Sequence, residues 1–471
     1  MMAQRGNKRP WMAVALALAL QGCATRGPIS LSCPIFDKTV FALPPSQLEQ
    51  DIQSDAGGNV SFVAAPAMES LSGLAAPAPP VARRGPDPLR DAFQRAKPDK
   101  RLENADPTRS VEGPPRPVTA LLLSGGGQWG AFGAGFLGSL QASGNAIAPD
   151  IVTGVSTGGL QSLFVTVGTP EAYARLVREY SPARQADLVS ANSTLLTAIT
   201  GSMAGIKPLR QAIERALCSE GDPAKGCPMI ADLANSKREA LIGFVEARSG
   251  QFVVADVKAM ANTSGAAYAG ISDRNRVARD CLTGAALASA GMPLFFQPVR
   301  INGRVYYDGG VRQSVFLAKV AEAAAASMTD DSGNTVRPPP TLYVIRNGPT
   351  QLLGPDGKPG DNDKVDSKFD ALTAALRAQS IIVNQVEIGS IAALRLFHPT
   401  GEINLATADG YQNHVWTDAS GASRACDKGQ ERFFNPDFMA CLRSLGRTKA
   451  QRRPSPWITL TPLSGLNAPH P

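Results

Sequence analysis

The sequence predicts an α/β fold, and two features of the chain after Pro117 indicate it. Short apolar runs typical of buried strands alternate with segments whose apolar residues recur at helical spacing. Two of these runs lead directly into glycine-rich turns followed by helices, which favours a sheet with parallel strands. The length of 471 residues is sufficient for one large or two ordinary domains with a hydrophobic core.

The composition excludes several classes of protein. Hydrophobic residues make up 43% of the chain and charged residues 18%, so it is neither a disordered polyelectrolyte nor a multispanning membrane protein. Only three histidines occur, His398, His414 and His470, which disfavours a zinc site. No basic stripe interleaved with aromatic residues occurs, so no nucleic-acid partner is predicted.

The N-terminal residues have the pattern of an export signal. Basic residues precede an apolar run from Trp11 to Leu20, which is too short to span a bilayer but long enough for the core of a signal peptide. The following Leu20-Gln21-Gly22-Cys23 resembles the lipobox of bacterial lipoproteins. It implies that residues 1–22 are removed and that Cys23 is lipidated. Ala24 favours the outer membrane of the cell envelope, in an undetermined leaflet; the alternative is ordinary secretion.

Residues 23–117 are expected to form a tether between the lipidated cysteine and a catalytic body. From Ala24 to Pro117 the chain holds 15 of its 37 prolines and few aromatic residues. The alternative is a partly ordered extension that wraps around the body. Removal of the signal peptide also reduces the net charge from +7 to +4, which weakens any case for a polyanionic partner.

Six cysteines remain after Cys23, and an oxidising compartment favours disulfide bonds between them. We expect the local pairs Cys218–Cys227 and Cys426–Cys441, because each pair brackets a short segment. The sequence leaves the state of Cys33 and Cys281 open. No C-x-x-C arrangement occurs, so neither a metal site nor a redox motif is predicted.

The first glycine-rich segment follows the apolar run 118–123. Its sequence, Ser124-Gly125-Gly126-Gly127-Gln128-Trp129-Gly130, leads into a predicted helix that extends to about Leu140. Uncovered backbone N–H groups and a helix N-terminus suit such a loop to an anion. The spacing also satisfies a dinucleotide fingerprint, but Asp150 precedes the next strand, whereas a ribose-binding acid would follow it.

The second glycine-rich segment, Gly154-Val155-Ser156-Thr157-Gly158, lies between a predicted strand and a predicted helix. A serine at such a sharp turn projects its side chain into the open, and the flanking glycines remove Cβ atoms that would clash. Ser156 is therefore the candidate nucleophile. The alternative is a glycine-rich turn with a capping serine.

Two residues compete as the base for Ser156. His398 is the only histidine suited to a conventional triad. Asp308, at the end of a β-rich run and followed by Gly309-Gly310, is the better candidate, because burial raises the pKa of a carboxyl and makes it a stronger base. An Asp-Gly hairpin turn is the alternative interpretation of this segment.

Together, the segments 124–130, 154–158 and 308–310 resemble the three motifs of patatin-like phospholipases, in the family's order. A fourth segment, 288–299, looks like the family's sequence ahead of its third motif. The resemblance covers about residues 118–345. It implies a three-layer α/β/α catalytic domain with a mostly parallel central sheet.

The resemblance also implies a serine acyl hydrolase that cleaves acyl esters of membrane phospholipid or other lipids with a Ser-Asp dyad. Ser156 would attack the ester, and Asp308 would act first as base and then as acid. Gly125, Gly126 and Gly127 would form the oxyanion hole. No histidine, metal or cofactor is needed. The other motif glycines are Gly130, Gly154, Gly158, Gly309 and Gly310.

The chain departs from the family's pattern at two places. Trp129 stands where the family usually has Lys or Arg, and Arg312-Gln313-Ser314-Val315 stands where it often has Asn and Pro. Head-group preference is therefore not predicted. Residues 346–471, with a long helix from about 366 to 396, are expected to pack on the catalytic domain as a C-terminal extension. A non-hydrolytic lipoprotein that binds lipid or a partner is the alternative function.

Overall fold

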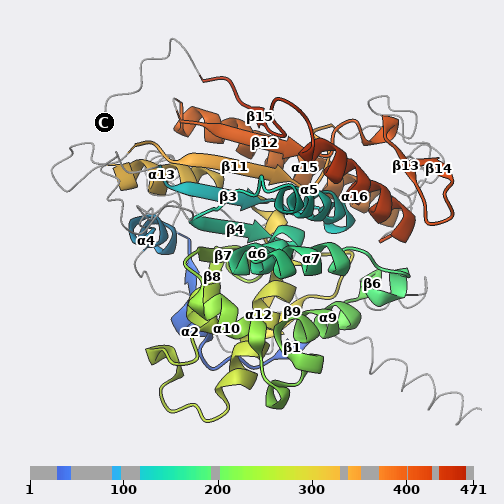
Figure 1. Ribbon diagram of the computed structural model, residues 1–471. Helices are drawn as coiled ribbons and strands as arrows, with labels where there is room; N and C mark the ends of the chain where they lie inside the picture. The colour runs from blue at the N-terminus through green and yellow to red at the C-terminus, as the bar shows by residue number, and fades with distance from the viewer. Residues whose placement is uncertain are drawn as a thin grey trace, which may run out of the picture.

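The computed structural model describes residues 29–43, 87–96, 117–192, 202–328, 338–351, 371–399, 401–426 and 434–462, which fold around one mixed sheet (Figure 1). Its eleven strands are β1 (Ser30–Leu31), β2 (Val40–Ala42), β3 (Thr119–Leu123), β4 (Ile151–Val155), β7 (Glu239–Glu246), β8 (Phe252–Asp256), β9 (Val299–Ile301), β10 (Arg304–Asp308), β11 (Thr341–Arg346), β12 (Ile403–Thr407) and β15 (Ile458–Thr459).

The strands follow the order β1-β9-β10-β7-β4-β3-β11-β12-β15, with β8 paired to β7 and β2 to β8. The five central strands, β7, β4, β3, β11 and β12, are parallel to one another. Strands near the edges, such as β10 on β7 and β15 on β12, are antiparallel. Because carboxyl ends of parallel strands meet at one edge, the loops after β3 and β4 are neighbours.

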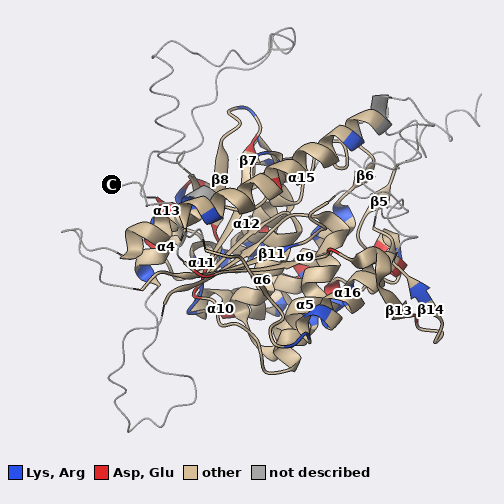
Figure 2. Cartoon of the chain, turned by 90° about the horizontal axis from the view of Figure 1, so that it is seen from above, with Lys and Arg blue, Asp and Glu red and all other residues tan. Residues whose placement is uncertain are grey.

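Helices cover both faces of the sheet, and side chains of each strand alternate between them (Figure 2). Leu121 and Leu123 of β3 join the core under one helix layer, whereas Ala120 and Leu122 join the core under the other. The first layer contains α5 (Gly130–Ala142), α6 (Thr157–Val167), α7 (Pro170–Glu179), α9 (Lys207–Leu217), α10 (Pro228–Asn235), α11 (Val257–Ala261), α12 (Arg274–Ser289) and α16 (Pro436–Ala450). The second contains α4 (Pro88–Arg95), α13 (Leu317–Met328) and α15 (Ala371–Phe397). The predicted three-layer α/β/α fold is confirmed.

Local signals account for several helix starts. Asp87 caps α4, Thr169 caps α7 and Asn435 caps α16, and each cap is followed by a proline at the first helical position. Small elements complete the described chain. They are α2 (Phe36–Thr39), β5 (Ser190–Ala191) paired with β6 (Ala204–Gly205), and β13 (Val415–Thr417) paired with β14 (Ser423–Ala425).

Two stretches of the expected tether are part of the folded body. β1 pairs with β9, and β2 pairs with β8. In α4, Leu89 and Phe93 are fully buried in the core that includes α13. The tether prediction is therefore wrong for residues 29–43 and 87–96, because their apolar side chains and strand edges find partners that proline content does not reveal. The signal peptide and Cys23 lie outside the described residues.

The described cysteines form three disulfide bonds. Cys218 bonds to Cys227 and Cys426 to Cys441, which are the two local pairs expected from the sequence. The third bond joins Cys33 to Cys281 of α12, across 248 residues of sequence. It links the N-terminal stretch to the body of the molecule.

The C-terminal extension shares the sheet of the catalytic domain. β12 and β15 continue the sheet beyond β11, and the expected boundary at residue 345 falls within β11 itself. In the first helix layer, α16 packs against α5 so closely that a Cβ on Gly135 would lie 2.3 Å from the carbonyl oxygen of Arg443. The extension is thus continuous with the core formed by residues 118–345.

The long helix α15 has an unusual distribution of charge. By length and composition, its residues 377–397 are the one segment of the described chain that is suited to cross a membrane. Here its inner side packs on the sheet, and its acidic residue, Glu387, is buried. No exposed side chain on the described part of the helix carries a charge. The exposed residues are Ala374, Ala378, Ser380, Ile381, Ile382, Gln385, Gly389, Ala392 and Leu396.

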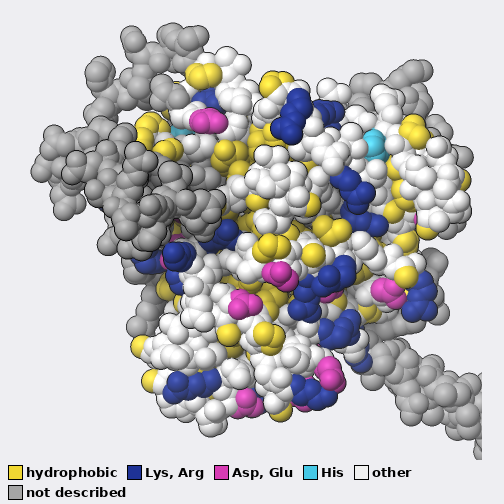
Figure 3. Space-filling model, viewed as in Figure 1, with side chains coloured by type: hydrophobic (Ala, Val, Ile, Leu, Met, Phe, Trp, Pro, Cys, Tyr) yellow, Lys and Arg dark blue, Asp and Glu magenta, His cyan; other side chains and the backbone are white. Residues whose placement is uncertain are grey.

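The surface elsewhere is mixed. On the face shown in Figure 3, basic and acidic side chains lie among apolar ones. The apolar outer side of α15 therefore contrasts with the usual surface helix, whose exposed side carries polar and charged residues.

Candidate active site

The glycine loop between β3 and α5 has a backbone that only glycine accommodates. Gly126 has a φ of 140° and Gly127 a φ of 56°. A Cβ on Gly126 would lie 1.9 Å from the carbonyl oxygen of Asn347, whereas one on Gly127 would meet nothing within 4 Å. The loop thus packs its backbone against the residue that follows β11.

The three glycine N–H groups of this loop differ in availability. Gly125 donates its N–H to Oγ of Ser314 at 3.0 Å. Within the described part of the chain, the N–H groups of Gly126 and Gly127 have no hydrogen-bond acceptor. Gly125 therefore has its donor engaged in this conformation, and only Gly126 and Gly127 can offer theirs to a bound oxyanion.

Ser156 lies on a strained turn between β4 and α6, with φ of 55° and ψ of −125°. Such a conformation costs a non-glycine residue about 1 to 3 kcal/mol. The turn is held by Ser289 of α12, whose Oγ accepts the Ser156 N–H at 2.8 Å and donates to the carbonyl oxygen of Gly243 at 2.7 Å. This arrangement projects the serine hydroxyl toward the glycine loop.

The glycines around Ser156 are required by close backbone contacts. A Cβ on Gly154 would lie 2.3 Å from the carbonyl oxygen of Gly158, and one on Gly158 would lie 2.2 Å from that of Leu123. Gly130 has a similar constraint, because its Cβ would lie 2.1 Å from Oγ1 of Thr157. These contacts explain why the sequence has glycine on both sides of Ser156.

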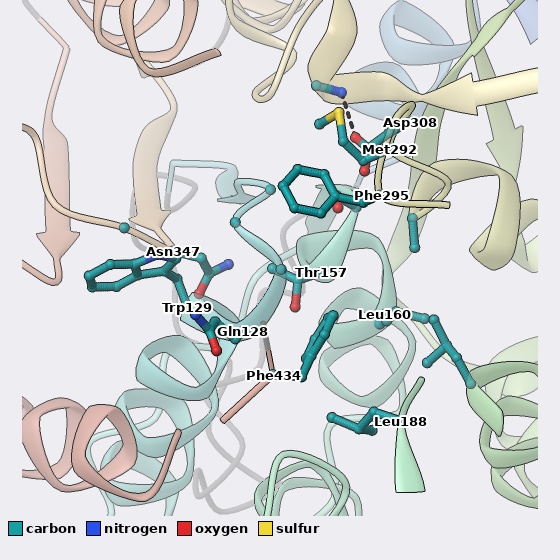
Figure 4. Close-up of a pocket in the computed structure, with 18 of the residues that line it drawn as sticks. Gln128, Trp129, Thr157, Leu160, Leu188, Met292, Phe295, Asp308, Asn347 and Phe434 are labelled. Atoms are coloured by element: carbon teal, nitrogen blue, oxygen red, sulfur yellow. Dashed lines mark hydrogen bonds between the residues drawn. The ribbon is translucent and has the colours of Figure 1, made fainter. Parts of the chain in front are cut away.

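Asp308 ends β10 and is completely buried beside the turn of Ser156. Its Oδ1 accepts the N–H of Gly310 at 2.7 Å, the bond drawn in Figure 4. Its Oδ2 has no hydrogen bond of ordinary geometry within the described chain. A Cβ on Gly309 would lie 2.8 Å from the carbonyl oxygen of Gly243, so glycine after the acid permits this packing.

The environment raises the pKa of Asp308 to about 7. Burial is the largest cause, because it disfavours the charged form. Hydrogen bonding by the nearby Ser156 hydroxyl and by the Gly310 N–H lowers the pKa, and the negative charge of Glu387 raises it. Asp308 is thus a carboxyl whose pKa suits proton transfer near neutral pH.

Ser156 and Asp308 open into a cavity of about 510 Å³. Figure 4 shows Asp308 beside Met292 and Phe295, with Leu160, Leu188 and Phe434 around the cavity. This volume is within the range that binds organic ligands. Most of the lining is apolar. It includes Leu160, Leu163, Phe164, Leu188, Val189, Met203, Leu209, Ile213, Phe295, Phe296, Phe434 and Met439.

A buried polar network behind the glycine loop was not predicted from the sequence. Oγ of Ser314 donates to Oε1 of Glu387 at 2.6 Å, and Oε2 of Glu387 lies 2.9 Å from the Arg346 guanidinium. Asn347 donates its backbone N–H to Oγ of Ser124 at 2.9 Å. Two features of the sequence could have indicated this network. Ser314 stands where the chain departs from the family pattern, and Glu387 is the single acidic residue in α15.

The structure does not bring the alternative base to the nucleophile. His398 is buried, and its Nε2 lies 2.9 Å from the carbonyl oxygen of Pro340, just before β11. Since β11 and β4 run parallel, this is the opposite end of the sheet from Ser156. Nε2 of His414 lies 3.1 Å from Oγ of Ser444 in α16, and His470 is outside the described residues.

Other sequence hypotheses find structural explanations. Asp150 accepts the N–H of Thr119 at 2.8 Å and so anchors the start of β3, away from the glycine loop. Trp129 packs edge-on against Tyr411 and Phe438. Arg312 is exposed and donates to the carbonyl oxygen of Gly250. No group of three or more His, Cys, Asp or Glu residues within the described ranges is placed to hold a metal.

The model of the patatin-like phospholipase family matches residues 121–321. No curated protein matches the chain. The crystal structure of VipD from Legionella pneumophila is similar at 11% identity and a TM-score of 0.31, covering 72% of this chain and 69% of that one.

A second similar structure is human GIVD cytosolic phospholipase A2 in complex with methyl gamma-linolenyl fluorophosphonate. It has 14% identity and a TM-score of 0.28, and the match covers 77% of this chain and 60% of that one. At such TM-scores, neither structure carries an argument about this site.

Proposed function

We propose that residues 121–321, which the model of the patatin-like phospholipase family matches, act as a lipid ester hydrolase, and that Ser156 and Asp308 are its catalytic dyad. The observation that carries the proposal is the position of Ser156. It lies on a strained turn beside a fully buried carboxyl whose Oδ2 has no ordinary hydrogen bond within the described chain. A serine hydroxyl and a buried carboxyl that line the same apolar cavity are the parts that acyl transfer needs.

The proposed reaction has two steps. Ionised Asp308 takes the proton from Oγ of Ser156 as Oγ bonds to the acyl carbonyl carbon, which forms a tetrahedral oxyanion. Collapse of this intermediate breaks the ester bond, and Asp308 returns the proton to the departing alcohol. Water then attacks the acyl-serine with Asp308 again as base, which releases the fatty acid and restores Ser156.

The oxyanion would be held by the N–H groups of Gly126 and Gly127. Both groups lack an acceptor in the described chain. They belong to the two residues after Gly125, which lies close to Ser156: a Cβ placed on Gly125 would be 3.3 Å from Cβ of Ser156. Loss of one such donor costs about 3 to 4 kcal/mol of transition-state stabilisation. The partial positive charge at the start of α5 adds to the same effect.

The substrate is proposed to be a phospholipid or another lipid ester. The cavity lining supports this choice, because apolar side chains such as Leu163, Phe164 and Ile213 favour an acyl chain. Disulfide bonds among six cysteines support export to an oxidising compartment. Lipidation of Cys23 would then keep the enzyme on a membrane of the bacterial cell envelope, most simply the outer membrane.

The outer side of α15 is proposed to contact the lipid surface. It exposes Ile381 and Ile382, and its one partly exposed charge in the described residues is Arg377, a turn before them, while Gln379 and Val383 of the same helix line the cavity. A helix that binds lipid along its outer side would bring the cavity to its substrate.

Labelling with a fluorophosphonate and release of fatty acid from phospholipid vesicles test the proposed dyad. Wild type and His398→Ala are expected to label and to release fatty acid together with lysophospholipid. Ser156→Ala is expected to do neither, and Asp308→Asn to lose at least about 10³-fold in rate. A folded wild type that never labels would instead support a non-hydrolytic lipoprotein, and loss of labelling in Ser156→Ala and His398→Ala but not in Asp308→Asn would support a Ser-His esterase.

A further inference from the structure

The C-terminal extension reaches the catalytic glycine loop through one buried chain of hydrogen bonds. Glu387 of α15 accepts the hydroxyl of Ser314 at 2.6 Å, and Ser314 accepts the N–H of Gly125 at 3.0 Å. Arg346, at the end of β11, lies 2.9 Å from the second carboxylate oxygen. The side chains of Glu387 and Arg346 are 6% and 4% exposed, so water does not compete for these bonds.

The direction of this chain is set by the charge of Glu387. A serine hydroxyl has one proton, and a carboxylate can only accept it. Because the hydroxyl proton of Ser314 is directed at Glu387, the lone pairs of the Ser314 oxygen face Gly125 and accept its N–H. The Arg346 guanidinium lies 2.9 Å from the other carboxylate oxygen, so both oxygens of Glu387 have a buried partner.

Gly125 is the residue at which such a bond has most effect. It directly precedes Gly126 and Gly127, whose N–H groups lack acceptors in the described chain and whose φ values are positive. A glycine loop is conformationally permissive, so its shape must be imposed by contacts. Asn347 restrains the loop at Gly126, and Ser314 restrains it at Gly125.

We propose that Glu387 and Ser314 are positioning residues that hold the glycine loop in the shape that binds the oxyanion. The proposal rests on the proposed function and adds to it a role for residues 346–471. Glu387 lies outside the stretch matched by the family, so the C-terminal extension would complete the active site.

The same carboxylate affects the catalytic base. The charged or titratable groups that face Glu387 are Arg346, from the end of β11, and Asp308, from the end of β10. Its negative charge raises the pKa of Asp308, as like charges do in a buried site. Loss of the Glu387 charge should therefore lower the pKa of Asp308, whereas loss of the Ser314 hydroxyl leaves that charge in place.

Two variants separate the two effects, with fatty acid release from a phospholipid vesicle as the assay. Ser314→Ala breaks the chain but keeps the Glu387–Arg346 pair, and we expect kcat to fall about 10- to 100-fold with little change in KM. Glu387→Gln is expected to lower kcat similarly and also to move the acid limb of the pH profile to lower pH. In Ser314→Ala the acid limb stays in place, and Ser314→Thr, which keeps a hydroxyl, is expected to restore most of the kcat.

The controls distinguish failure of this inference from failure of the proposed function. Glu220→Gln, the same change at an exposed carboxylate away from α15, is expected to have wild-type kinetics. If the wild type is active but both Ser314→Ala and Glu387→Gln keep kcat within about twofold, the positioning role is wrong and the dyad is unaffected. If kcat falls only in step with thermal stability, and Ser314→Thr does not restore it, the network is merely structural. An inactive wild type, by contrast, overturns the dyad itself.

Discussion

The Oγ of Ser289 lies 2.8 Å from the backbone nitrogen of Ser156 and accepts its hydrogen bond. The same Oγ donates to the carbonyl oxygen of Gly243 in β7, so a single hydroxyl joins the turn of Ser156 to the sheet. Ser289 is fully buried, and it lies 133 residues away from Ser156 in the sequence. The strained backbone of Ser156 is thus held by a side chain from a different helix.

Ser289→Ala is expected to weaken this turn. It leaves one N–H and one carbonyl group buried without their side-chain partner, so the free energy of unfolding should fall by about 1 to 3 kcal/mol. The rate of fluorophosphonate labelling should fall as well, because Ser156 loses its fixed direction. Ser162→Ala is the matched control, since Ser162 is also buried but bonds only within its own helix. Equal labelling rates in the two variants would show that Ser289 has no positioning role.

The pH dependence of the reaction should report the ionisation of Asp308. The carboxyl must be ionised to accept the serine proton, and its pKa is raised to about 7. We therefore expect kcat/KM to rise about tenfold per pH unit below this value and to level off above it. Initial rates on a soluble ester, measured between about pH 5 and 9, test this. An acid limb centred near the ordinary pKa of Asp, 3.8, would contradict a buried catalytic carboxyl.

The same buried carboxyl should reduce stability at high pH. In the folded chain the pKa of Asp308 is raised from 3.8 to about 7, so between these values the folded state binds more protons than the unfolded state. The free energy of unfolding therefore falls as pH rises through this window. Asp308→Asn removes the ionisation and should be more stable than wild type by about 1 to 3 kcal/mol near pH 8.5, and by less near pH 4.5. Urea unfolding at both pH values measures the difference, and a gain that is the same at both would contradict the linkage.

Gly126 and Gly127 provide a matched pair of loop substitutions. Alanine at Gly126 meets the Asn347 carbonyl oxygen at 1.9 Å and also adopts a φ of 140°, so the loop must move. Alanine at Gly127 meets no atom within 4 Å and requires only a left-handed φ of 56°, at a cost of about 1 kcal/mol. We expect Gly126→Ala to lose at least about 100-fold in kcat and Gly127→Ala about tenfold or less. Measurement of kcat for both variants on one ester tests this expectation. A larger loss in Gly127→Ala than in Gly126→Ala would show that the loop binds the oxyanion in another way.

Charge on the outer side of α15 should weaken contact with lipid. Ile381 and Ile382 are 48% and 60% exposed, and Ile458 of β15 is 51% exposed on another element. The double change Ile381→Lys and Ile382→Lys is expected to lower the fraction that sediments with neutral phosphatidylcholine vesicles at least about threefold, because the lysines place charge against the acyl region. Ile458→Lys should bind as wild type does. Equal loss in both variants would assign the effect to charge in general and not to α15.

The local sequence was sufficient to predict the elements that hold the motifs. Apolar runs at 118–123 and 151–153 became β3 and β4, because their side chains are buried on both faces of the sheet. The glycines around Ser156 are explained by backbone contacts within two adjacent loops, which is why a short motif could indicate a sharp turn. The N-terminal segment was harder. Its prolines predicted a tether, but a short strand such as β1 is stable only because β9 is beside it.

The sequence by itself thus determined the fold class and the turn at Ser156, since each depends on patterns of residues close together in the chain, and it nominated Asp308 as the partner of Ser156 from its own local motif. The tertiary structure decided the rest. It placed His398 at the far end of the sheet, engaged the N–H of Gly125, and brought Ser289, Ser314 and Glu387 to the loops of Ser156 and Gly125. Each of these contacts joins residues separated by 58 or more positions, and such pairs are set by how strands and helices pack, which no local pattern of residues specifies.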